Sequence, residues 1–466
     1  MFEENEEEFD RDFREDIERF ERSLQGEEFG FMDADRIEML VDHYLIHSSY
    51  SKAATCCDIG ISQFPFNHIF LLRKAQALSA QGKLKEALGL LNEYEQTSVI
   101  GCEFNLTKAS IFSQLKDSKR AIRYFREALN DSDIEDKDEI YLDLAMEYQQ
   151  QGDYQSAIQV LQEAIHQNPK NEGAIYELAY CYDHTKEIEK AIKCYSDFID
   201  ENPYSFTAWY NLGNAYSKEE NYEKAIWAYD YCIVINESFS PAYFNLGNAC
   251  LSLERYQTAI EYFEKCMELD GEDGLALCYI GECQEQLGNL ELARHYYLRS
   301  IEFIPELPEA WLGLGIVKDL EGQTEDAIQL IRKAIDFEPT NGSFRHVLAG
   351  AYEKLELLDE AEEAYLLAIE LDPENEDIFT DYVEFLSEQN SLIDALHFTE
   401  KSEFPESMEF VKNLCRVNIL WQLNRKEEAL STLIYCISED EKRAKHLFTL
   451  YPELQNESKI VNLFAN

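Results

Sequence analysis

Apolar side chains recur along this chain at the spacing of one face of an α-helix. Residues 209–232 show the pattern clearly, because apolar positions follow one another there at intervals of three, four and seven. A polar segment, Lys218 to Asn221, divides this stretch into two halves. The apolar and small positions are Trp209, Leu212, Gly213, Tyr216, Ala225, Tyr229 and Cys232. We therefore predict two helices joined by a turn, which together form a helix pair.

One alanine marks the same place in twelve successive copies of this unit. The interval between these alanines is 34 residues everywhere except between Ala121 and Ala157, where it is 36. The full set is Ala53, Ala87, Ala121, Ala157, Ala191, Ala225, Ala259, Ala293, Ala327, Ala361, Ala395 and Ala429. A fixed period of this length is typical of proteins in which one small unit stacks on the next, so it predicts a solenoid.

Small residues also mark the place where the two helices of each pair are expected to cross. The position 12 residues before the repeated alanine is glycine or alanine in nine copies, and a bulky side chain forced into such a crossing costs about 1 to 3 kcal/mol. Proline stands 12 residues after the alanine in six copies, where it cannot extend the second helix. These positions predict close packing within each pair and a stop after it.

The arrangement of Trp, Leu-Gly, Tyr, Ala and Pro resembles that of the tetratricopeptide repeat family over about residues 34–440. Its most specific stretches are Trp209-Leu212-Gly213-Tyr216 and Trp311-Leu314-Gly315. The resemblance implies an all-α fold, a right-handed α-solenoid or superhelix of stacked antiparallel helix pairs with terminal capping helices. It also implies that the first helix of each pair lines the concave side.

This interpretation divides the chain into three parts. Residues 1–33 form an acidic amphipathic N-terminal helix, residues 34–440 form about twelve helix pairs, and residues 441–466 form C-terminal capping helices. The longer interval places a two-residue insertion near residues 131–138, which we interpret as a longer connecting turn or a mild hinge. A solenoid grows by adding interfaces between neighbours, so the length of 466 residues requires no break between domains.

Both ends carry apolar residues that suit a cover for the terminal helix pairs. The N-terminal stripe, with spacings of four, four, three and four, is Phe9, Phe13, Ile17, Phe20 and Leu24. The C-terminal set is Leu447, Leu450, Ile460, Val461, Leu463 and Phe464. Two roles stay open for the N-terminal helix: it either caps the first pair or acts as a built-in ligand that a partner displaces.

Charge narrows the class of partner. The chain has 41 basic and 92 acidic residues, a net charge of -51, so nucleic acid and anionic membrane surfaces are poor partners. We see neither a secretory signal in the first residues nor an apolar run of about 20 residues, and we expect a cytoplasmic protein. The 12 cysteines are then expected to be thiols that fill small apolar positions.

No motif of an enzyme is present, and we predict neither a catalytic residue nor a cofactor. Cys56-Cys57 and the pair Cys278 and Cys283 lack the paired spacing of a zinc site. His43 and His47 stand four residues apart on one expected helix, but their spacing indicates no third ligand. We therefore predict no metal site.

Binding residues are expected on the first helices, facing away from the second helix of their pair. The candidate peptide-binding residues are Tyr176, Tyr180, Tyr210, Asn211, Asn214, Phe244, Asn245 and Asn248, in which asparagine amides suit a peptide backbone and aromatic rings suit apolar or cationic groups. The candidate acidic groove is Glu282, Glu285, Glu309, Asp319, Glu353, Asp377, Glu384 and Glu388. The basic residues that clamp a terminal carboxylate in chaperone-binding members of the family are absent from the best copies.

We therefore expect a non-catalytic scaffold or adaptor that binds a peptide or protein segment, basic or amphipathic in character, on its concave side. Two alternatives stay open: a self-associating structural protein, and a regulatory subunit of an enzyme complex. The sequence does not separate a monomer from a homodimer, and it does not identify the partner.

Overall fold

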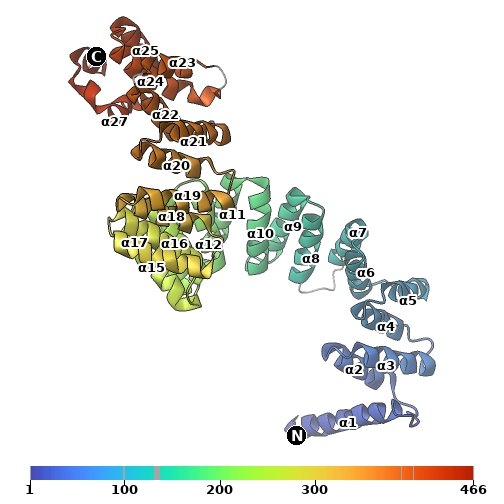
Figure 1. Ribbon diagram of the computed structural model, residues 1–466. Coiled ribbons are helices and arrows are strands. Elements are labelled where there is room, and N and C mark those ends of the chain that lie inside the picture. Colours follow the sequence, from blue (N-terminus) through green and yellow to red (C-terminus); the bar gives the residue numbers. More distant parts are fainter. Residues whose placement is uncertain (1, 98–99, 131–136, 390, 402–403, 465–466) are drawn as a thin grey trace. The chain divides into compact units, whose positions relative to one another are not determined.

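The computed structural model describes residues 2–97, 100–130, 137–389, 391–401 and 404–464. In these ranges the regular elements are all helices, most of them 12 to 15 residues long and arranged as antiparallel pairs (Figure 1). This confirms the prediction of an all-α solenoid. None of the described helices is both long enough and apolar enough to cross a lipid bilayer. The residues fall into two compact units, 1–237 and 238–466.

The first unit begins with a single long helix, which is followed by helix pairs. Its helices are α1 (Phe2–Ser23), α2 (Ala34–Ile46), α3 (Tyr50–Gln63), α4 (Ile69–Ala80), α5 (Leu84–Thr97), α6 (Cys102–Gln114), α7 (Ser118–Leu129), α8 (Asp138–Gln150), α9 (Tyr154–Gln167), α10 (Glu172–Thr185), α11 (Ile188–Glu201), α12 (Phe206–Lys218) and α13 (Tyr222–Ile235). Residues 131–136 lie outside the described residues, so the structure gives no account of the predicted insertion there.

The second unit continues the helix pairs and ends in short helical segments. Its helices are α14 (Ser240–Ser252), α15 (Tyr256–Asp270), α16 (Gly274–Gln286), α17 (Leu290–Phe303), α18 (Pro308–Leu320), α19 (Thr324–Phe337), α20 (Gly342–Lys354), α21 (Leu358–Leu371), α22 (Glu376–Glu388), α23 (Leu392–Glu400), η1 (Glu406–Met408), α24 (Glu409–Gln422), α25 (Lys426–Glu439), α26 (Glu441–Ala444), α27 (Leu447–Leu450), η2 (Pro452–Asn456), α28 (Ser458–Val461) and η3 (Asn462–Phe464).

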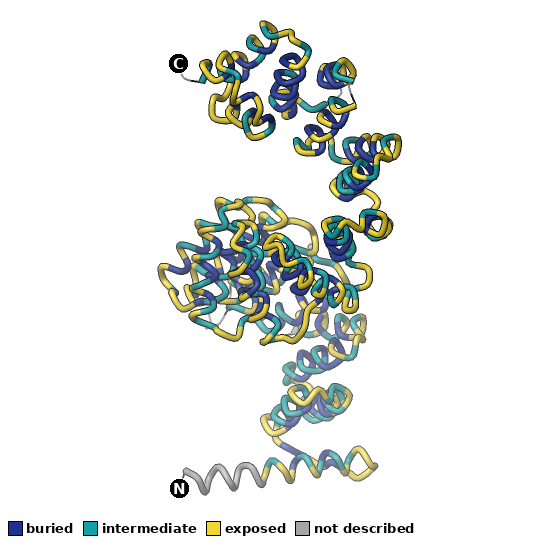
Figure 2. The backbone as a smooth tube through the Cα atoms, turned by 60° about the vertical axis from the view of Figure 1, so that its left-hand side comes forward, coloured by how far each residue is buried: buried dark blue, intermediate teal, exposed yellow. Residues whose placement is uncertain are grey.

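Small residues allow the two helices of a pair to approach each other. All twelve repeated alanines are buried, and burial follows the contacts between helices along each unit (Figure 2). A Cβ atom on Gly213 would lie 2.4 Å from Cε1 of Tyr229, and one on Gly247 would lie 2.6 Å from Cε1 of Phe263. Each ring therefore occupies the space that a side chain on the first helix would need.

Tyr297 on α17 is enclosed by two glycines from different helix pairs. A Cβ atom on Gly281, in the same pair, would lie 2.9 Å from the ring, and one on Gly313, in the next pair, would lie 2.2 Å from Cζ. The ring is almost fully buried between them. One aromatic side chain thus joins two neighbouring pairs, and both neighbours need a position without a side chain.

Helix α1 packs on the first helix pair through an apolar stripe and several polar contacts. Phe20 is fully buried against Phe29 and Tyr44, with ring centroids 6.2 and 5.2 Å apart. Phe13 and Ile17 are partly buried in the same cluster, whereas Leu24 is exposed. The side chain of Phe9 lies outside the described residues. Polar contacts add to the docking: Arg36 pairs with Asp16 at 2.6 Å, Lys52 pairs with Glu21 at 2.6 Å, and the Tyr44 hydroxyl donates to Glu21 at 2.9 Å.

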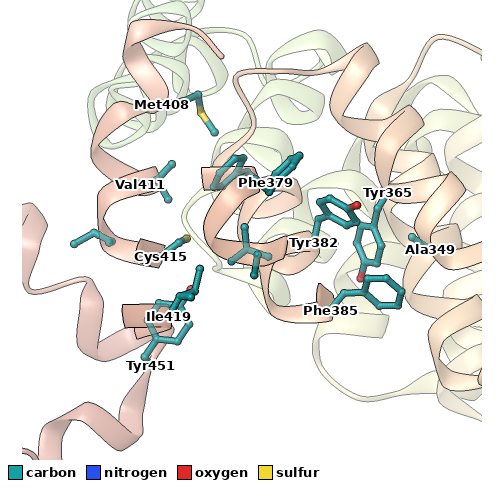
Figure 3. Packing of buried hydrophobic residues seen from close by; sticks show 14 of the residues in the cluster. Ala349, Tyr365, Phe379, Tyr382, Phe385, Met408, Val411, Cys415, Ile419 and Tyr451 are labelled. Carbon is teal, nitrogen blue, oxygen red and sulfur yellow. The ribbon is translucent and has the colours of Figure 1, made fainter. Parts of the chain in front are cut away.

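The last helices enclose an aromatic cluster. Phe379 on α22 stacks on Phe398 at 5.3 Å and meets Phe404 edge-on at 5.0 Å, and Tyr382 lies beside them (Figure 3). Leu447 and Ile460 are fully buried in the same core. Of the remaining C-terminal apolar residues, Leu450, Leu463 and Phe464 are partly buried against this core, and Val461 is exposed.

Candidate interaction surfaces

Successive first helices contact each other along both units. Helix α8 contacts α10 and α10 contacts α12 in the first unit, and α16 contacts α18 and α18 contacts α20 in the second. Contacts between successive second helices are weaker. Because the first helices approach one another more closely, each stack curves toward them, and their exposed side chains form what we call the first-helix surface.

A pocket of about 260 Å³ opens on this surface between α10, α11 and α12. Helices α10 and α11 contact each other less closely than the helices of the other described pairs, which leaves this space. Its lining is Ala179, Tyr182, Asp183, Lys186, Ile188, Ala191, Tyr195, Asn211, Asn214, Ala215 and Lys218. An ion pair between Asp183 and Lys218 joins two of these lining residues from neighbouring helix pairs. The mixture of apolar walls with a few polar groups suits the side chain of a bound segment.

Two of the predicted asparagines line this pocket, but both already make hydrogen bonds inside the protein. The Asn211 amide is only 5% exposed, and its Nδ2 donates to the Ile175 carbonyl of the preceding first helix at 3.0 Å. The Asn214 Oδ1 accepts a hydrogen bond from the Tyr229 hydroxyl at 2.7 Å. Asn211 therefore helps to join neighbouring helix pairs, and both amides already use hydrogen-bonding groups inside the protein.

Two tyrosines of α10 are the most solvent-exposed of the candidate peptide-binding residues. Tyr176 is 68% exposed and Tyr180 is 51% exposed. The Tyr180 ring meets His184 edge-on at 4.5 Å, and His184 stacks flat against Tyr154 at 4.2 Å. A hydrogen bond with Tyr180 raises the pKa of Tyr154. These neighbours hold Tyr180 in place, so it offers a fixed aromatic surface.

The remaining candidates divide between the two units. Tyr210 on α12 is partly exposed in the first unit and lies 5.9 Å from the Tyr229 ring. Phe244, Asn245 and Asn248 lie on α14 in the second unit, where all three are partly exposed and Phe244 packs against Phe263. The structure therefore brings Asn211 and Asn214 into one pocket of the first unit, whereas Phe244, Asn245 and Asn248 belong to the second unit.

Half-buried carboxylates lie on the first-helix surface of the second unit, and Glu38 on α2 of the first unit is of the same kind, with a pKa that burial also raises. Burial raises the pKa of Glu282, and it raises the pKa of Glu285 to about 7, although Glu285 also accepts a hydrogen bond from the Tyr297 hydroxyl at 2.9 Å. Burial likewise raises the pKa of Glu353, which accepts a hydrogen bond from the Tyr365 hydroxyl at 3.1 Å. Loss of hydration opposes the charged form at each of these groups.

The other acidic candidates are more varied. Asp319 on α18 is paired with Lys354 of the next first helix and accepts a hydrogen bond from Thr324 at 2.8 Å, so its charge is compensated inside the protein. The side chain of Glu384 on α22 is exposed by surface area, but the surrounding protein removes part of its hydration, and this loss together with neighbouring carboxylates raises its pKa. The exposed members are Glu309, Asp377, Glu384 and Glu388.

Sequence reasoning missed the ion pairs that join successive first helices. Asp183 pairs with Lys218 and Asp319 pairs with Lys354, and in both cases the two residues are 35 positions apart. A search for oppositely charged residues 35 positions apart, which is one residue more than the repeat period of 34, would have found them. Arg73 on α4 was also missed; it pairs with three carboxylates, those of Glu38, Asp42 and Glu103.

Cysteines and possible metal ligands complete the chemical description. All twelve cysteines are thiols, and only Cys102 and Cys194 are partly exposed. Burial raises the pKa of Cys56 to about 12, which disfavours its thiolate form. Among the described residues, no three His, Cys, Asp or Glu side chains are grouped so that they could hold a metal ion.

The raised pKa of Glu285 predicts a pH-dependent stability. The folded-state value of about 7 lies above the ordinary value of 4.5, so protonation favours folding; this contribution is fully present below pH 4.5 and is lost as the pH rises through 7. Glu285→Gln keeps an acceptor for Tyr297 but removes the titration. Between pH 5 and pH 8, the free energy of unfolding of the wild type should fall by about 2 kcal/mol more than that of the variant.

Urea unfolding at several pH values, followed by circular dichroism, measures this difference. The exposed carboxylate of Glu302 on α17 supplies the control, because Glu302→Gln removes a charge from the same unit without changing a buried group. An equal pH dependence in the wild type and in Glu285→Gln would show that Glu285 is not the group responsible.

Comparison with known proteins identifies the repeat. Models of the tetratricopeptide repeat match residues 103–130, 148–197, 194–226, 240–273, 276–307 and 320–380. No curated protein sequence matches this chain significantly.

Among solved structures, the chain is similar to the APC/C hetero-tetramer Cut9–Hcn1, with 15% identity, 83% of this chain and 90% of that chain covered, and a TM-score of 0.44. It is also similar to a tetratricopeptide repeat protein from Parabacteroides merdae, with 17% identity, coverage of 52% and 96%, and a TM-score of 0.44. A third similar structure is YrrB, described as a tetratricopeptide repeat protein with an unusual peptide-binding site, with 24% identity, coverage of 38% and 92%, and a TM-score of 0.31. The matches of the family models along the chain, together with the repeated helix pairs, show that this protein belongs to the tetratricopeptide repeat family.

Proposed function

We propose that this protein is a non-catalytic adaptor that holds a basic or amphipathic segment of a partner protein on its first-helix surface. Its repeats support a general role as a scaffold for protein–protein interaction. The nature of the bound segment is our inference from the carboxylates of the second unit, and the whole chain adds a net charge of -51 that attracts basic partners.

The observation that carries this proposal is the partial burial of the Glu282 and Glu285 carboxyl groups on α16. Burial raises the pKa of both groups, so the free protein holds them at an energetic cost when they are ionised. A lysine or arginine bound beside these groups would stabilise the charged carboxylates and offset part of this free-energy cost. Binding of a cationic side chain is therefore favoured more here than at a fully hydrated carboxylate.

The pocket on the first unit supports the amphipathic part of the proposal. Its walls are mainly alanine, isoleucine and tyrosine, whereas the amides of Asn211 and Asn214 and the Asp183–Lys218 pair supply polar groups. Tyr176 and Tyr180 on α10 offer exposed rings on the same unit. An apolar side chain of a bound segment suits this pocket, and polar main-chain groups suit its edge.

A binding experiment with a matched charge control tests the proposal. A partner recovered from a cell lysate with the wild-type chain is titrated against Glu282→Gln/Glu285→Gln and against Glu291→Gln/Glu302→Gln, which removes two exposed charges from α17 instead. The α16 variant should bind at least about tenfold more weakly, and the α17 variant should change affinity by less than about twofold. Wild-type binding should also be tighter at pH 8 than at pH 6, because Glu285 is ionised at pH 8.

Two results would contradict the proposal. Equal losses in the two variants would show that only the overall charge matters, and an affinity that does not change with salt concentration would remove the electrostatic part altogether. Binding that survives in both variants but is lost in Asn214→Ala/Tyr180→Ala would place the segment on the first unit alone.

A further inference from the structure

A stripe of exposed apolar side chains runs along α13, the second helix of the sixth pair. Trp227, Tyr231 and Val234 follow one another at spacings of four and three, so they share one helix face. Trp227 and Tyr231 are each 46% exposed, and Val234 is 80% exposed. None of the three belongs to the buried residues of α13, which are Ala225, Ala228, Tyr229 and Cys232. The stripe therefore lies outside the core of the helix pair.

The other helix pairs show that the fold does not require apolar residues at these places. In the third to the tenth pairs, apart from the sixth, every equivalent residue except Leu367 is polar. The equivalent sets are Arg123, Glu127, Asn130; Gln159, Glu163, His166; Lys193, Asp197, Asp200; Glu261, Lys265, Glu268; His295, Arg299, Glu302; Gln329, Lys333, Asp336; and Glu363, Leu367, Glu370. Outside this range the position of Tyr231 is aromatic again in the twelfth pair, at the exposed Tyr435. A tryptophan at the position of Trp227 occurs in the sixth copy alone, where the solenoid itself does not require it.

The two exposed rings rest on a buried third ring. Tyr231 stacks on Trp209 of α12 with centroids 4.5 Å apart, and Trp227 meets Trp209 edge-on at 5.0 Å. Trp227 and Tyr231 are also edge-on to each other at 5.5 Å. The Trp209 Nε1 donates to the Pro203 carbonyl at 2.9 Å, which fixes the central ring. These contacts hold the exposed rings in one arrangement before anything binds, so a partner loses little entropy by contacting them.

The ninth helix pair shows which group suits this place. Trp311 there is equivalent to Trp209, and its Nε1 makes the same bond, to Pro305, at 2.9 Å. Lys333, which is equivalent to Tyr231, places its ammonium 3.4 Å from the centre of the Trp311 ring. The chain thus uses a cation to cover this tryptophan in one pair and leaves aromatic rings exposed in another. In the sixth pair Tyr231 takes the place of that ammonium on Trp209, so Trp227 and Tyr231 are the rings left exposed to a cation from outside.

Charge on the preceding second helix favours the same occupant. Asp197 and Asp200 on α11 stand at the positions equivalent to Tyr231 and Val234, and both are exposed, as are Glu201 and Lys193, which is equivalent to Trp227. These four side chains together leave a net negative charge on the exposed face of α11, in the same unit as the two rings, and this charge attracts arginine and lysine. A second copy of this chain fits poorly, because a symmetric contact would bring two such acidic surfaces together in a protein with a net charge of -51.

We propose that Trp227, Tyr231 and Val234 form a second docking surface, separate from the first-helix surface, for a partner segment that presents arginine or lysine beside apolar side chains. The cation covers the rings of Trp227 and Tyr231, and the apolar side chains cover Val234. This proposal does not depend on the function proposed for the first helices, since it uses the opposite helix of the pair and different residues.

Fluorine NMR of protein labelled with 5-fluorotryptophan tests the proposal directly, because the chain has only 4 tryptophans. The probe is a short blocked peptide of alternating arginine and leucine, and its matched control carries glutamate in place of arginine. The titration uses the Glu282→Gln/Glu285→Gln background, which weakens binding to the first-helix surface. The arginine peptide should shift the resonances of Trp227 and Trp209, and those of Trp311 and Trp421 should not move.

A variant that copies the ninth pair supplies the second arm of the experiment. Trp227→Gln, Tyr231→Lys and Val234→Asp together give the sixth pair the residues that the ninth pair carries, so the solenoid keeps side chains that it already accommodates. This triple variant should bind the arginine peptide at least about tenfold more weakly. Unchanged circular dichroism would confirm that the variant is folded.

Three outcomes would overturn the proposal. The first is an unmoved Trp227 resonance, and the second is an equal shift with the glutamate peptide. The third is a concentration-dependent dimer in analytical ultracentrifugation that the triple variant abolishes, because that would make a second copy of the chain the occupant. None of these results bears on the carboxylates of α16, which remain testable with their own variants.

Discussion

Replacing Phe20 with alanine is expected to lower the local free energy of opening of α1–α3 by about 3 to 5 kcal/mol. Phe20 is fully buried between Phe29 and Tyr44, so the substitution leaves a cavity and removes the main apolar contact of α1. Native-state hydrogen exchange of the amides in α1, α2 and α3 measures the effect, since a solenoid opens locally rather than as one unit.

The same variant separates the two roles considered for the N-terminal helix. If α1 is a cap, Phe20→Ala loosens the first helix pair, and affinity for a partner does not increase. Leu24→Ala is the matched control, because Leu24 belongs to the same stripe but is exposed. Tighter partner binding by Phe20→Ala, with unchanged exchange in α2 and α3, would instead support a built-in ligand.

Replacing Gly313 with alanine is expected to destabilise the second unit by about 1 to 3 kcal/mol, although alanine is the better helix former. The new Cβ atom would lie 2.2 Å from Cζ of Tyr297, and Gly281 on the other side leaves that ring little room to retreat. A displaced Tyr297 would also weaken its hydrogen bond to Glu285, so the pH dependence assigned to Glu285 should change in the same variant.

Gly350 supplies an internal control for this prediction. It is also a glycine within a helix, but a Cβ atom there would meet no atom within 4 Å. Gly350→Ala should therefore stabilise the second unit by about 1 kcal/mol through helix propensity alone. Thermal unfolding of the two variants should show shifts of opposite sign. A stabilising effect of Gly313→Ala would mean that Tyr297 can move without cost.

Much of the fold could be predicted because its determinants repeat. The position of Ala225 and its eleven equivalents depends only on close packing between two helices, and such packing leaves a trace at a constant interval in the sequence. The division into two units near Glu237 left no such trace, because no change of composition accompanies it.

The candidate sites were less predictable, because they depend on contacts between different helix pairs. Asn211 looked like a residue for a ligand, but the structure shows that it donates to the Ile175 carbonyl of the preceding pair. The raised pKa of Glu285 follows from burial next to Tyr297, and a sequence rich in glutamate does not show which carboxylates are buried. Trp227 was detectable, since comparison of equivalent positions alone separates it from the other copies, whereas the position of Tyr231 is also aromatic in the twelfth copy, at Tyr435.

The enclosure of Tyr297 also limits how the copies can be rearranged. The position of Gly313 is asparagine, tyrosine, valine or aspartate in the neighbouring copies, at Asn245, Tyr279, Val347 and Asp381. Each of those side chains would meet the Tyr297 ring in its present position. Other copies do combine a tyrosine at the position of Tyr297 with such a side chain, as Tyr195 is followed by Asn211 and Tyr365 by Asp381. A copy without glycine placed after the eighth would therefore require the Tyr297 ring to move, so the fit between two neighbours depends on which copy follows which.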